Sequence, residues 1–456
     1  MSKNNKELST TQVIMLGFLS VILVGSLLLM MPFSSADGTF TPYLTALFTS
    51  TTSVCVTGLV VVDTYAHWSF IGQLIILVLI QCGGLGVVTL STYIMTLLGR
   101  KIGLKQRLLL EDALNLSTLS GLVKFIKKVF WGTLIIEGIG ALLYMTVFIP
   151  EFGFKGIWIS IFNSISAFCN AGMDVIGPVS LVAYVNNPII NFTTMGLIII
   201  GGIGFIVWWD LISVGVKRRN KEIYRHQIWS RLQFHTKIVL AATMVLIVVG
   251  FLAVLILEYN NPQTLGQLGF FSKLQAALFQ SVTTRTAGFM TISQLDLKDS
   301  TALICMILMF IGGSPVGTAG GIKTTTAAVL IIAVFSTIKG SDNTTIFKRN
   351  INPVVIRKSL AVTVISLCAL LTGTIILLST SDGSFVDVTY EAFSAIGTVG
   401  LSRAYTANLN IVGRIVIIIL MYLGRTGPIS LAMAFTNIAN KNKNRVQYPE
   451  GGITVG

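Results

Sequence analysis

Four short segments of the chain, each rich in serine, threonine and small residues, end in a glycine followed by an apolar residue. They read TTSVCVTGL, ISAFCNAGM, SVTTRTAGF and FSAIGTVGL, and their glycines are Gly58, Gly172, Gly288 and Gly400. Glycine adopts positive φ angles, which let successive carbonyl oxygens of a strand point the same way. Four such strands around an axis would form rings of carbonyl oxygens, which in selective pores replace the hydration shell of a potassium ion.

The three residues that end in each glycine are therefore the predicted selectivity filter, with the ion at the carbonyls of the four glycines. Only the fourth segment spells the Thr-Val-Gly of potassium channels. The predicted filter residues are Val56, Thr57, Gly58, Asn170, Ala171, Gly172, Thr286, Ala287, Gly288, Thr398, Val399 and Gly400.

The composition predicts an all-α polytopic membrane protein. Of the 456 residues, 53% are hydrophobic and 11% are charged, which is far from the composition of a soluble domain. Eight apolar stretches approach or exceed the roughly 20 residues that cross a bilayer as a helix. The first has the length of a span and lacks the cleavage site of a signal peptide. The stretches fall at about 11–31, 70–98, 122–149, 189–216, 237–257, 301–338, 354–379 and 411–438.

The net charge of +14 follows this topology and does not indicate a nucleic-acid partner. Of the 32 Lys and Arg residues, 24 lie at the N-terminus, at 100–128, 217–237 and 339–358, and in the tail. Eight spans place all five segments on one side, and the positive-inside rule makes that side cytoplasmic, with both termini. Acidic residues on the other side, such as Asp63 and Asp174, either concentrate cations at a pore mouth or are ordinary loop residues.

A segment too short to cross the bilayer separates the two spans of each pair. These segments run at about 41–58, 157–172, 271–288 and 386–400. Each is expected to enter from the outside as a half-length helix and to return as a strand. Irregular backbone at this depth is tolerated only inside protein or along a water-filled cavity, so four such loops imply one shared cavity. This pattern argues against a transporter built from inverted repeats, because corresponding loops would then enter from opposite sides.

Each following helix contains a glycine cluster at a similar distance in sequence from the filter glycine before it. The first glycines of the clusters, Gly83, Gly201, Gly312 and Gly424, follow the filter glycines by 25, 29, 24 and 24 residues. We therefore predict four parallel helix-pore loop-helix repeats with pseudo-fourfold symmetry around a central pore. Their ranges are 1–100, 101–217, 218–340 with a broken second helix, and 341–456 with a short cytoplasmic tail. In the first two repeats the clusters are expected to serve close helix packing.

The third repeat departs from this symmetry at GGSPVGTAGGIKTTT, residues 312–326. Glycine and proline weaken a helix, so a loop is expected in the middle of this span. It is either a gate below the filter or a kinked helix without a moving part. It is not a nucleotide P-loop, because Ile322 separates Gly321 from Lys323. The predicted gate residues are Gly312, Gly313, Ser314, Gly317, Thr318, Gly320, Gly321, Lys323 and Arg425.

Arg425 lies in the matching register of the fourth repeat. A charged side chain at membrane depth costs roughly 2.5–3.5 kcal/mol and usually faces a cavity or a partner. We expect Arg425 to face the pore and to hold the carbonyls of the loop, or else to pair with a buried acid such as Glu137. Arg285, three residues before Gly288, is expected to point behind its strand and to anchor it.

The remaining reactive residues give no sign of an enzyme. The five cysteines have no metal-ligand spacing and are interpreted as small buried hydrophobes, although Cys55 and Cys169 could also line the entrance to the filter. His67, His226 and His235 fall in loops or at interfaces. No organic cofactor is expected in this chain.

The four pore loops, the break at 312–326 and Arg425 together resemble the Trk/Ktr/HKT superfamily of potassium transporters over essentially the whole chain, most closely its KtrB-type membrane subunits. The resemblance implies potassium uptake through the filter, gated by the loop and Arg425, in the plasma (inner) membrane of a bacterial cell. It also implies a homodimer that rests on a cytoplasmic ring of RCK-type regulatory subunits binding ATP or ADP, and sodium as an activator.

The sequence leaves two mechanisms open. One is a gated ion channel, and the alternative is a sodium-coupled secondary potassium transporter. The docking surface for the regulatory ring is expected at the basic loops 217–237 and 339–358, whose charge is equally explained by topology and anionic lipid. The tail PEGGITVG resembles the short tail at the dimer interface of the family.

Overall fold

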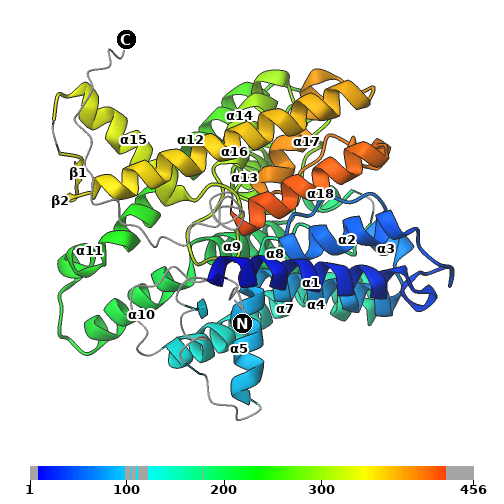
Figure 1. Ribbon diagram of the computed structural model, residues 1–456, viewed down its shortest axis with the longest axis horizontal. Helices are drawn as coiled ribbons and strands as arrows, with labels where there is room; N and C mark the ends of the chain where they lie inside the picture. The colour runs from blue at the N-terminus through cyan, green and yellow to red at the C-terminus, as the bar shows by residue number, and fades with distance from the viewer. Residues whose placement is uncertain are drawn as a thin grey trace, which may run out of the picture.

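The structure is a computed structural model that describes residues 9–97, 103, 109–110, 122–177, 179–341 and 343–427. Within these ranges the secondary-structure elements are all α- or 3-10 helices apart from one antiparallel ribbon, β1 (Thr345–Ile346) with β2 (Arg349–Asn350). In Figure 1 this ribbon and the α10–α11 segment (Phe205–Arg219 and Ile228–Arg231) lie at one end of the molecule, and α3 (Thr64–His67) lies at the other. The basic segments 217–231 and 345–350 are therefore on the same side.

The helices form four repeats, each with an outer helix, a short pore helix and an inner helix. The outer helices are α1 (Thr10–Met30), α7 (Leu122–Phe152), α12 (Phe234–Glu258) and α16 (Pro353–Thr380). The pore helices are α2 (Tyr43–Cys55), α8 (Lys155–Cys169), α13 (Phe270–Thr283) and α17 (Phe385–Gly397). The inner helices begin with α4 (Phe70–Leu85), α9 (Pro188–Gly202), α14 (Asp299–Phe310) and α18 (Ile411–Thr426). This arrangement confirms the predicted fold class.

Equivalent contacts hold the outer helix to the pore helix in three repeats. A serine of the pore helix donates to a carbonyl of the outer helix, from Ser50 to Ile22 at 2.7 Å, Ser164 to Glu137 at 2.6 Å and Ser281 to Ile247 at 2.7 Å. Three residues after each acceptor is a glycine, and a Cβ atom on it would collide with the same serine. The hydroxyl thus satisfies its hydrogen bond inside a close helix contact, as polar residues in membrane bundles do.

In the first, second and fourth repeats, the inner helix packs on the end of the pore helix through its first cluster glycine. A Cβ atom on Gly83 would meet the carbonyl of Val54, one on Gly201 that of Phe168, and one on Gly424 that of Ile396. Each of these carbonyls belongs to the residue four positions before the filter glycine of the same repeat. The spacing between the two glycine markers therefore reflects a backbone contact that no larger residue permits, which agrees with the packing expected for the first two clusters.

The inner helices are less regular than the sequence predicts. The predicted spans at 70–98 and 189–216 are not single straight helices, because α4 and α5 (Val87–Leu97) meet at 98° and α9 and α10 meet at 99°. The turns lie at Gly86 and Gly204, whose φ angles of 84° and 93° an L-residue rarely adopts. Four helices of the described chain can each cross a membrane, and the two bent pairs raise the number to six.

The predicted break in the third repeat is present. Helix α14 ends at Phe310 and α15 (Thr324–Ile338) begins fourteen residues later, and both are shorter than a span. We refer to residues 311–323 as the interrupting loop. The end of the predicted eighth span, the basic tail and the segment 449–456 lie outside the described residues.

Candidate functional site

The four glycines predicted to form the filter lie next to one another. A Cβ atom on each would collide with the carbonyl oxygen of the residue that precedes a neighbouring glycine, and would also approach the Cα of that glycine. The pairs are Gly58 with Ala171, Gly172 with Ala287, Gly288 with Val399, and Gly400 with Thr57. The contacts run from repeat one to repeat four and back to one, so the glycines form a closed ring around one axis.

Backbone geometry explains why these positions are glycine. The φ angles are 95°, 66°, 83° and 95° in chain order. In each hairpin the residue two positions earlier also has a positive φ, from 51° at Thr398 to 67° at Thr286. These left-handed residues lie at or just after the carboxyl ends of the pore helices. The carbonyl oxygen just before each ring glycine lies close to a ring glycine of a neighbouring hairpin.

Hydroxyl groups of the pore helices hold each hairpin from behind. Thr52 accepts from the amide of Gly58 at 2.9 Å, and Ser394 accepts from the amide of Gly400 at 3.0 Å. In the other two hairpins Ser166 and Thr283 donate to the carbonyls that follow the ring glycines, at 2.5 Å and 2.6 Å. These four residues account for part of the serine and threonine content of the segments. They hold the ring backbone in one conformation.

The pore helices add an electrostatic component, because each ends at the ring. The carboxyl end of a helix carries a partial negative charge from its unsatisfied carbonyls. Helices α2, α8 and α17 each end three residues before their ring glycines, and α13 ends five residues before Gly288. The ring therefore lies where four negative helix ends meet, which favours a cation.

The side chains two positions before the ring glycines are all buried. They are Val56, Asn170, Thr286 and Thr398, so this level is chemically unequal around the axis. Asn170 Nδ2 lies 3.5 Å from Thr286 Oγ1. Among the described residues, Asn170 Oδ1 and Thr398 Oγ1 have no hydrogen-bond partner.

The interrupting loop packs against the second repeat. The amides of Ser314 and Thr318 donate to the carbonyls of Gly202 and Gly201, at 2.9 Å and 3.2 Å. The Thr318 hydroxyl donates to the carbonyl of Phe168 at the end of α8, at 3.1 Å. In return, the amide of Phe205 donates to Val316 at 2.8 Å. The loop is thereby held at the bend between α9 and α10.

The loop also touches the fourth hairpin and braces itself. A Cβ atom on Gly320 would collide with the side chain of Thr398. Lys323 donates to the carbonyl of Ala319 at 2.7 Å, and Ser314 and Thr324 share a hydrogen bond of 2.8 Å. The loop therefore spans from repeat two to repeat four immediately beside the hairpins. It is an ordered segment with its own internal hydrogen bonds.

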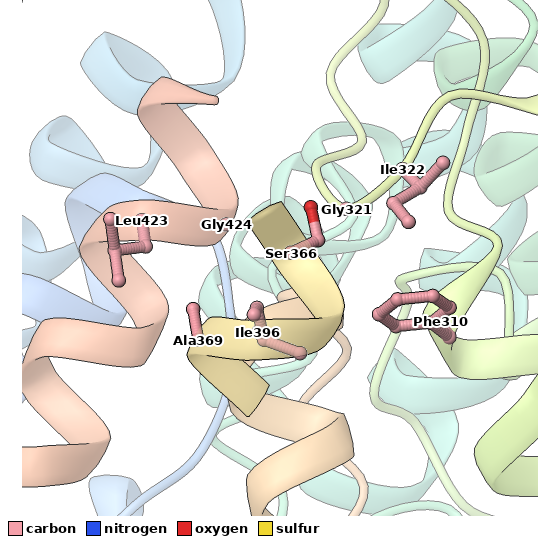
Figure 2. Close-up of a pocket in the computed structure, with 8 residues that line it drawn as sticks. All are labelled: Phe310, Gly321, Ile322, Ser366, Ala369, Ile396, Leu423 and Gly424. Atoms are coloured by element: carbon pink, nitrogen blue, oxygen red, sulfur yellow. The ribbon is translucent and has the colours of Figure 1, made fainter. Parts of the chain in front are cut away.

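A small pocket lies beside one end of the loop. Figure 2 shows Gly321 and Ile322 of the loop on one side of it, Ser366 and Ala369 of α16 on another, and Gly424 of α18 close by. The other lining residues are Phe310, Ile396 and Leu423. Packed side chains therefore do not enclose this end of the loop on every side.

Arg425 connects the loop to the first repeat. Its Nη1 atom donates to the carbonyl of Thr318, and its Nη2 atom donates to the carbonyl of Gly83 and, at 3.4 Å, to that of Gly84. The planar guanidinium suits this task because it presents several donors in a fixed geometry. Glu137 instead accepts from Gln81 at 3.2 Å, and no bond between it and Arg425 occurs in the described part of the chain. The alternative considered from the sequence, a pair of Arg425 with Glu137, is therefore absent among the described residues.

Comparison with known proteins places this architecture in a family. The sequence model of TrkH, described as a cation transport protein, matches residues 5–445. The chain belongs to the TrkH family of cation transport proteins. The Ktr system potassium uptake protein B of Bacillus subtilis (strain 168) is 39% identical over 446 residues, which cover 98% of this chain and 96% of that protein. The family transports cations, so the chain is not an enzyme.

Two further relatives show how far the similarity extends. The potassium/sodium uptake protein NtpJ of Enterococcus hirae is 38% identical over 456 residues, covering 99% of this chain and 98% of that protein. The crystal structure of the potassium transporter TrkH from Vibrio parahaemolyticus superimposes with a TM-score of 0.73 at 18% identity, covering 96% of this chain and 86% of that one. The likeness to TrkH is one of fold.

One charged residue close in sequence to a ring glycine of this TrkH family member was not singled out from the sequence. Arg403, three residues after Gly400, pairs with Asp387 at 2.7 Å and donates to the carbonyls of Gln294 and Leu297 at 3.0 Å and 3.2 Å. It joins the outer loop of the third repeat to the fourth hairpin. An arginine so close to a ring glycine is the signal that could have identified it.

The other charged and thiol groups singled out from the sequence differ in burial. Arg285 is buried, but its Nη1 atom has no hydrogen-bond partner among the described residues, so the predicted anchoring contact is not found for that atom. Cys55 and Cys169 are buried, as expected of small hydrophobes, whereas Cys82 is half-buried and Cys368 is exposed, against the prediction that all five are buried. No cluster of three or more potential metal ligands occurs in the described residues.

Proposed function

We propose that this chain mediates potassium uptake across the cell membrane and that the ring of Gly58, Gly172, Gly288 and Gly400 is its selectivity filter. The observation that carries the proposal is the closed ring of glycines at the carboxyl ends of four pore helices. Carbonyl oxygens held at such a ring can replace the hydration shell of potassium. The potassium named in the descriptions of the relatives is the same ion.

We propose further that the interrupting loop is the gate and that this structure represents its closed state. Arg425 bonds the loop to the first repeat, and the amides of the loop bond it to the second repeat. The loop, which belongs to the third repeat, is therefore joined to two others. Opening requires that Arg425 release Thr318. The small pocket beside Gly321 and Ile322 lies between this end of the loop and α16.

The partner we propose is a cytoplasmic ring of RCK-type subunits that binds ATP or ADP, with the membrane protein acting as a homodimer in the plasma membrane of a bacterium. The designation of the Bacillus subtilis relative as part of a Ktr system supports an assembly of several components. The basic end of α10, with exposed Arg218 and Arg219, is the proposed docking surface, and both termini are proposed to be cytoplasmic. Replacing Arg218, Arg219 and Arg225 by Ala should abolish co-purification with the ring. If the variant still co-purified with the ring, the positive charge of these residues would instead be explained by membrane topology and anionic lipid.

Flux in proteoliposomes tests the function directly. Purified protein should carry potassium down its gradient, faster with the ring and ATP than with ADP, and should carry sodium more slowly. Protein without potassium flux in any of these conditions would contradict the proposal.

A sodium-coupled mechanism remains the second candidate, because the name of NtpJ includes sodium. The two mechanisms differ in what a sodium gradient does. Under a channel mechanism sodium acts as an activator and cannot drive potassium uphill. Uphill potassium movement driven only by an imposed sodium gradient would establish coupling.

A further inference from the structure

The fourfold symmetry assigns each residue its counterparts in the other repeats. The serine contacts identify Glu137 of α7 as the counterpart of Ile22 in α1 and Ile247 in α12, because each is the acceptor of the pore-helix serine. Each also lies three residues before the glycine that packs on that serine. One repeat thus carries a carboxyl group where two others carry isoleucine.

Glu137 is buried, with 4% of its surface exposed. Its Oε2 atom accepts from Gln81 Nε2 at 3.2 Å, and its Oε1 atom lies 3.9 Å from the sulfur of Cys169. The same sulfur lies 3.4 Å from Gln81 Oε1. Glu137, Gln81 and Cys169 therefore form a compact polar cluster that joins α7, α4 and the end of the pore helix α8.

This cluster lies directly behind the second filter hairpin. Cys169 is the last residue of α8 and is followed by Asn170, Ala171 and Gly172. Its sulfur is also in contact with the inner helix of the first repeat, since a Cβ atom on Gly84 would lie 2.6 Å from it. Any displacement of the Cys169 side chain would be passed to Asn170, whose backbone starts the turn into the ring.

The first repeat provides an internal comparison. Cys55 is the counterpart of Cys169, three residues before Gly58, and is equally buried. The counterpart of Glu137 there is Ile22, so an aliphatic residue suffices for packing at this position. A carboxyl group at membrane depth is costly, and such residues usually have a function.

We propose that Glu137 is a specificity-determining positioning residue: by accepting the hydrogen bond of Gln81 behind Cys169, it holds the second filter hairpin in the geometry that favours potassium over sodium. The residue does not touch the ion and acts through Cys169 and Asn170. This inference rests on the proposed function, because it concerns the selectivity of the same filter.

The test compares Glu137→Leu with Glu137→Gln in proteoliposomes, measuring potassium and sodium flux separately. Glu137→Leu removes the acceptor, leaves the Gln81 amide unpaired, and should lower the potassium-to-sodium flux ratio about tenfold, equivalent to about 1.4 kcal/mol. Glu137→Gln keeps an acceptor oxygen of the same shape and should stay within about twofold of wild type. Ile22→Leu, at the counterpart position without an acid, is the matched control and should leave the ratio unchanged.

Coupling separates positioning from a general loss of structure. Gln81→Leu should lower the ratio as Glu137→Leu does, and the double variant should lose little more than either single variant, because all three remove the same bond. Gln81→Leu also provides the test if Glu137→Leu does not fold, as judged by size-exclusion chromatography and thermal melting.

Two results would overturn the inference: an unchanged ratio in the folded leucine variants, or an equal fall in Glu137→Gln, which would assign the effect to charge. The proposed function fails separately, because it requires selective potassium flux by the wild-type protein. Selective wild-type protein with insensitive variants would remove only the role of Glu137.

Discussion

Replacing Arg425 by alanine should release the interrupting loop, the proposed gate. The side chain donates to the carbonyls of Thr318 in the loop and Gly83 in the first repeat, and more weakly to Gly84. Hydrogen bonds from a charged donor contribute about 1.5–3 kcal/mol each. With the lower value for the two close bonds, the substitution removes about 3 kcal/mol in favour of the closed loop. Since about 1.4 kcal/mol is a factor of ten, the population of open loops should rise about 100-fold.

The assay is potassium flux into proteoliposomes without the regulatory ring, where the closed state should dominate. Arg425→Ala should raise this basal flux by up to about 100-fold, until the open state saturates. Arg425→Lys should give an intermediate value, because one ammonium group cannot reproduce the fork that reaches two separate carbonyls.

The matched control is Arg414→Ala on the same helix. Arg414 donates to the carbonyl of Leu409 and lies 3.5 Å from Thr45 Oγ1, with no bond to the loop. It should leave basal flux unchanged. An unaltered flux of Arg425→Ala at every activator level, or an equal rise in Arg414→Ala, would refute the reasoning.

Three further changes test other parts of the site. In Gly288→Ala, a Cβ atom would lie 2.6 Å from the carbonyl of Val399 at a φ of 83°, so the potassium-to-sodium flux ratio should fall at least about tenfold. Arg403→Ala leaves Asp387 and two carbonyls without their donor and should lower the free energy of unfolding by about 2–3 kcal/mol, measured by denaturation in detergent. Burial, with a smaller effect of neighbouring Asp63, raises the pKa of Asp174 in the outer loop to about 6. Its negative charge is therefore lost as the external pH falls from 7 to 5, which should reduce potassium uptake, and Asp174→Asn should remove that dependence.

The fourfold plan could be predicted because its signals are local. The ring glycines need positive φ and the cluster glycines need close backbone approach, and both needs appear as glycine in each repeat. The break at 312–326 was predicted for the same reason, since glycine and proline weaken a helix wherever they occur. The bends at Gly86 and Gly204 were missed, because a single glycine after a packing glycine gives no sign of its φ angle.

Contacts between distant segments could not be predicted. Gln81 and Glu137 are 56 residues apart, and Arg403 reaches carbonyls more than 100 residues away. Hydropathy and spacing report which residues are buried but not which of them meet. The same limit left the partner of Arg425 open between the loop and Glu137, and only the three-dimensional arrangement distinguishes them.

The departures from symmetry agree with what the proposed filter and the proposed gate require. A filter surrounds a spherical ion, so equivalent backbone from all four repeats serves it best, and the ring contacts are equivalent. A loop beside the axis can come from only one repeat, because four loops of this length could not occupy the same space. The break in the third repeat therefore needs anchors that the other repeats lack. These anchors are the glycines at the α9 bend and Arg425, which directly follows the first cluster glycine of the fourth repeat, where the other repeats have a second glycine. Unequal side chains thus collect around a backbone that stays nearly symmetric.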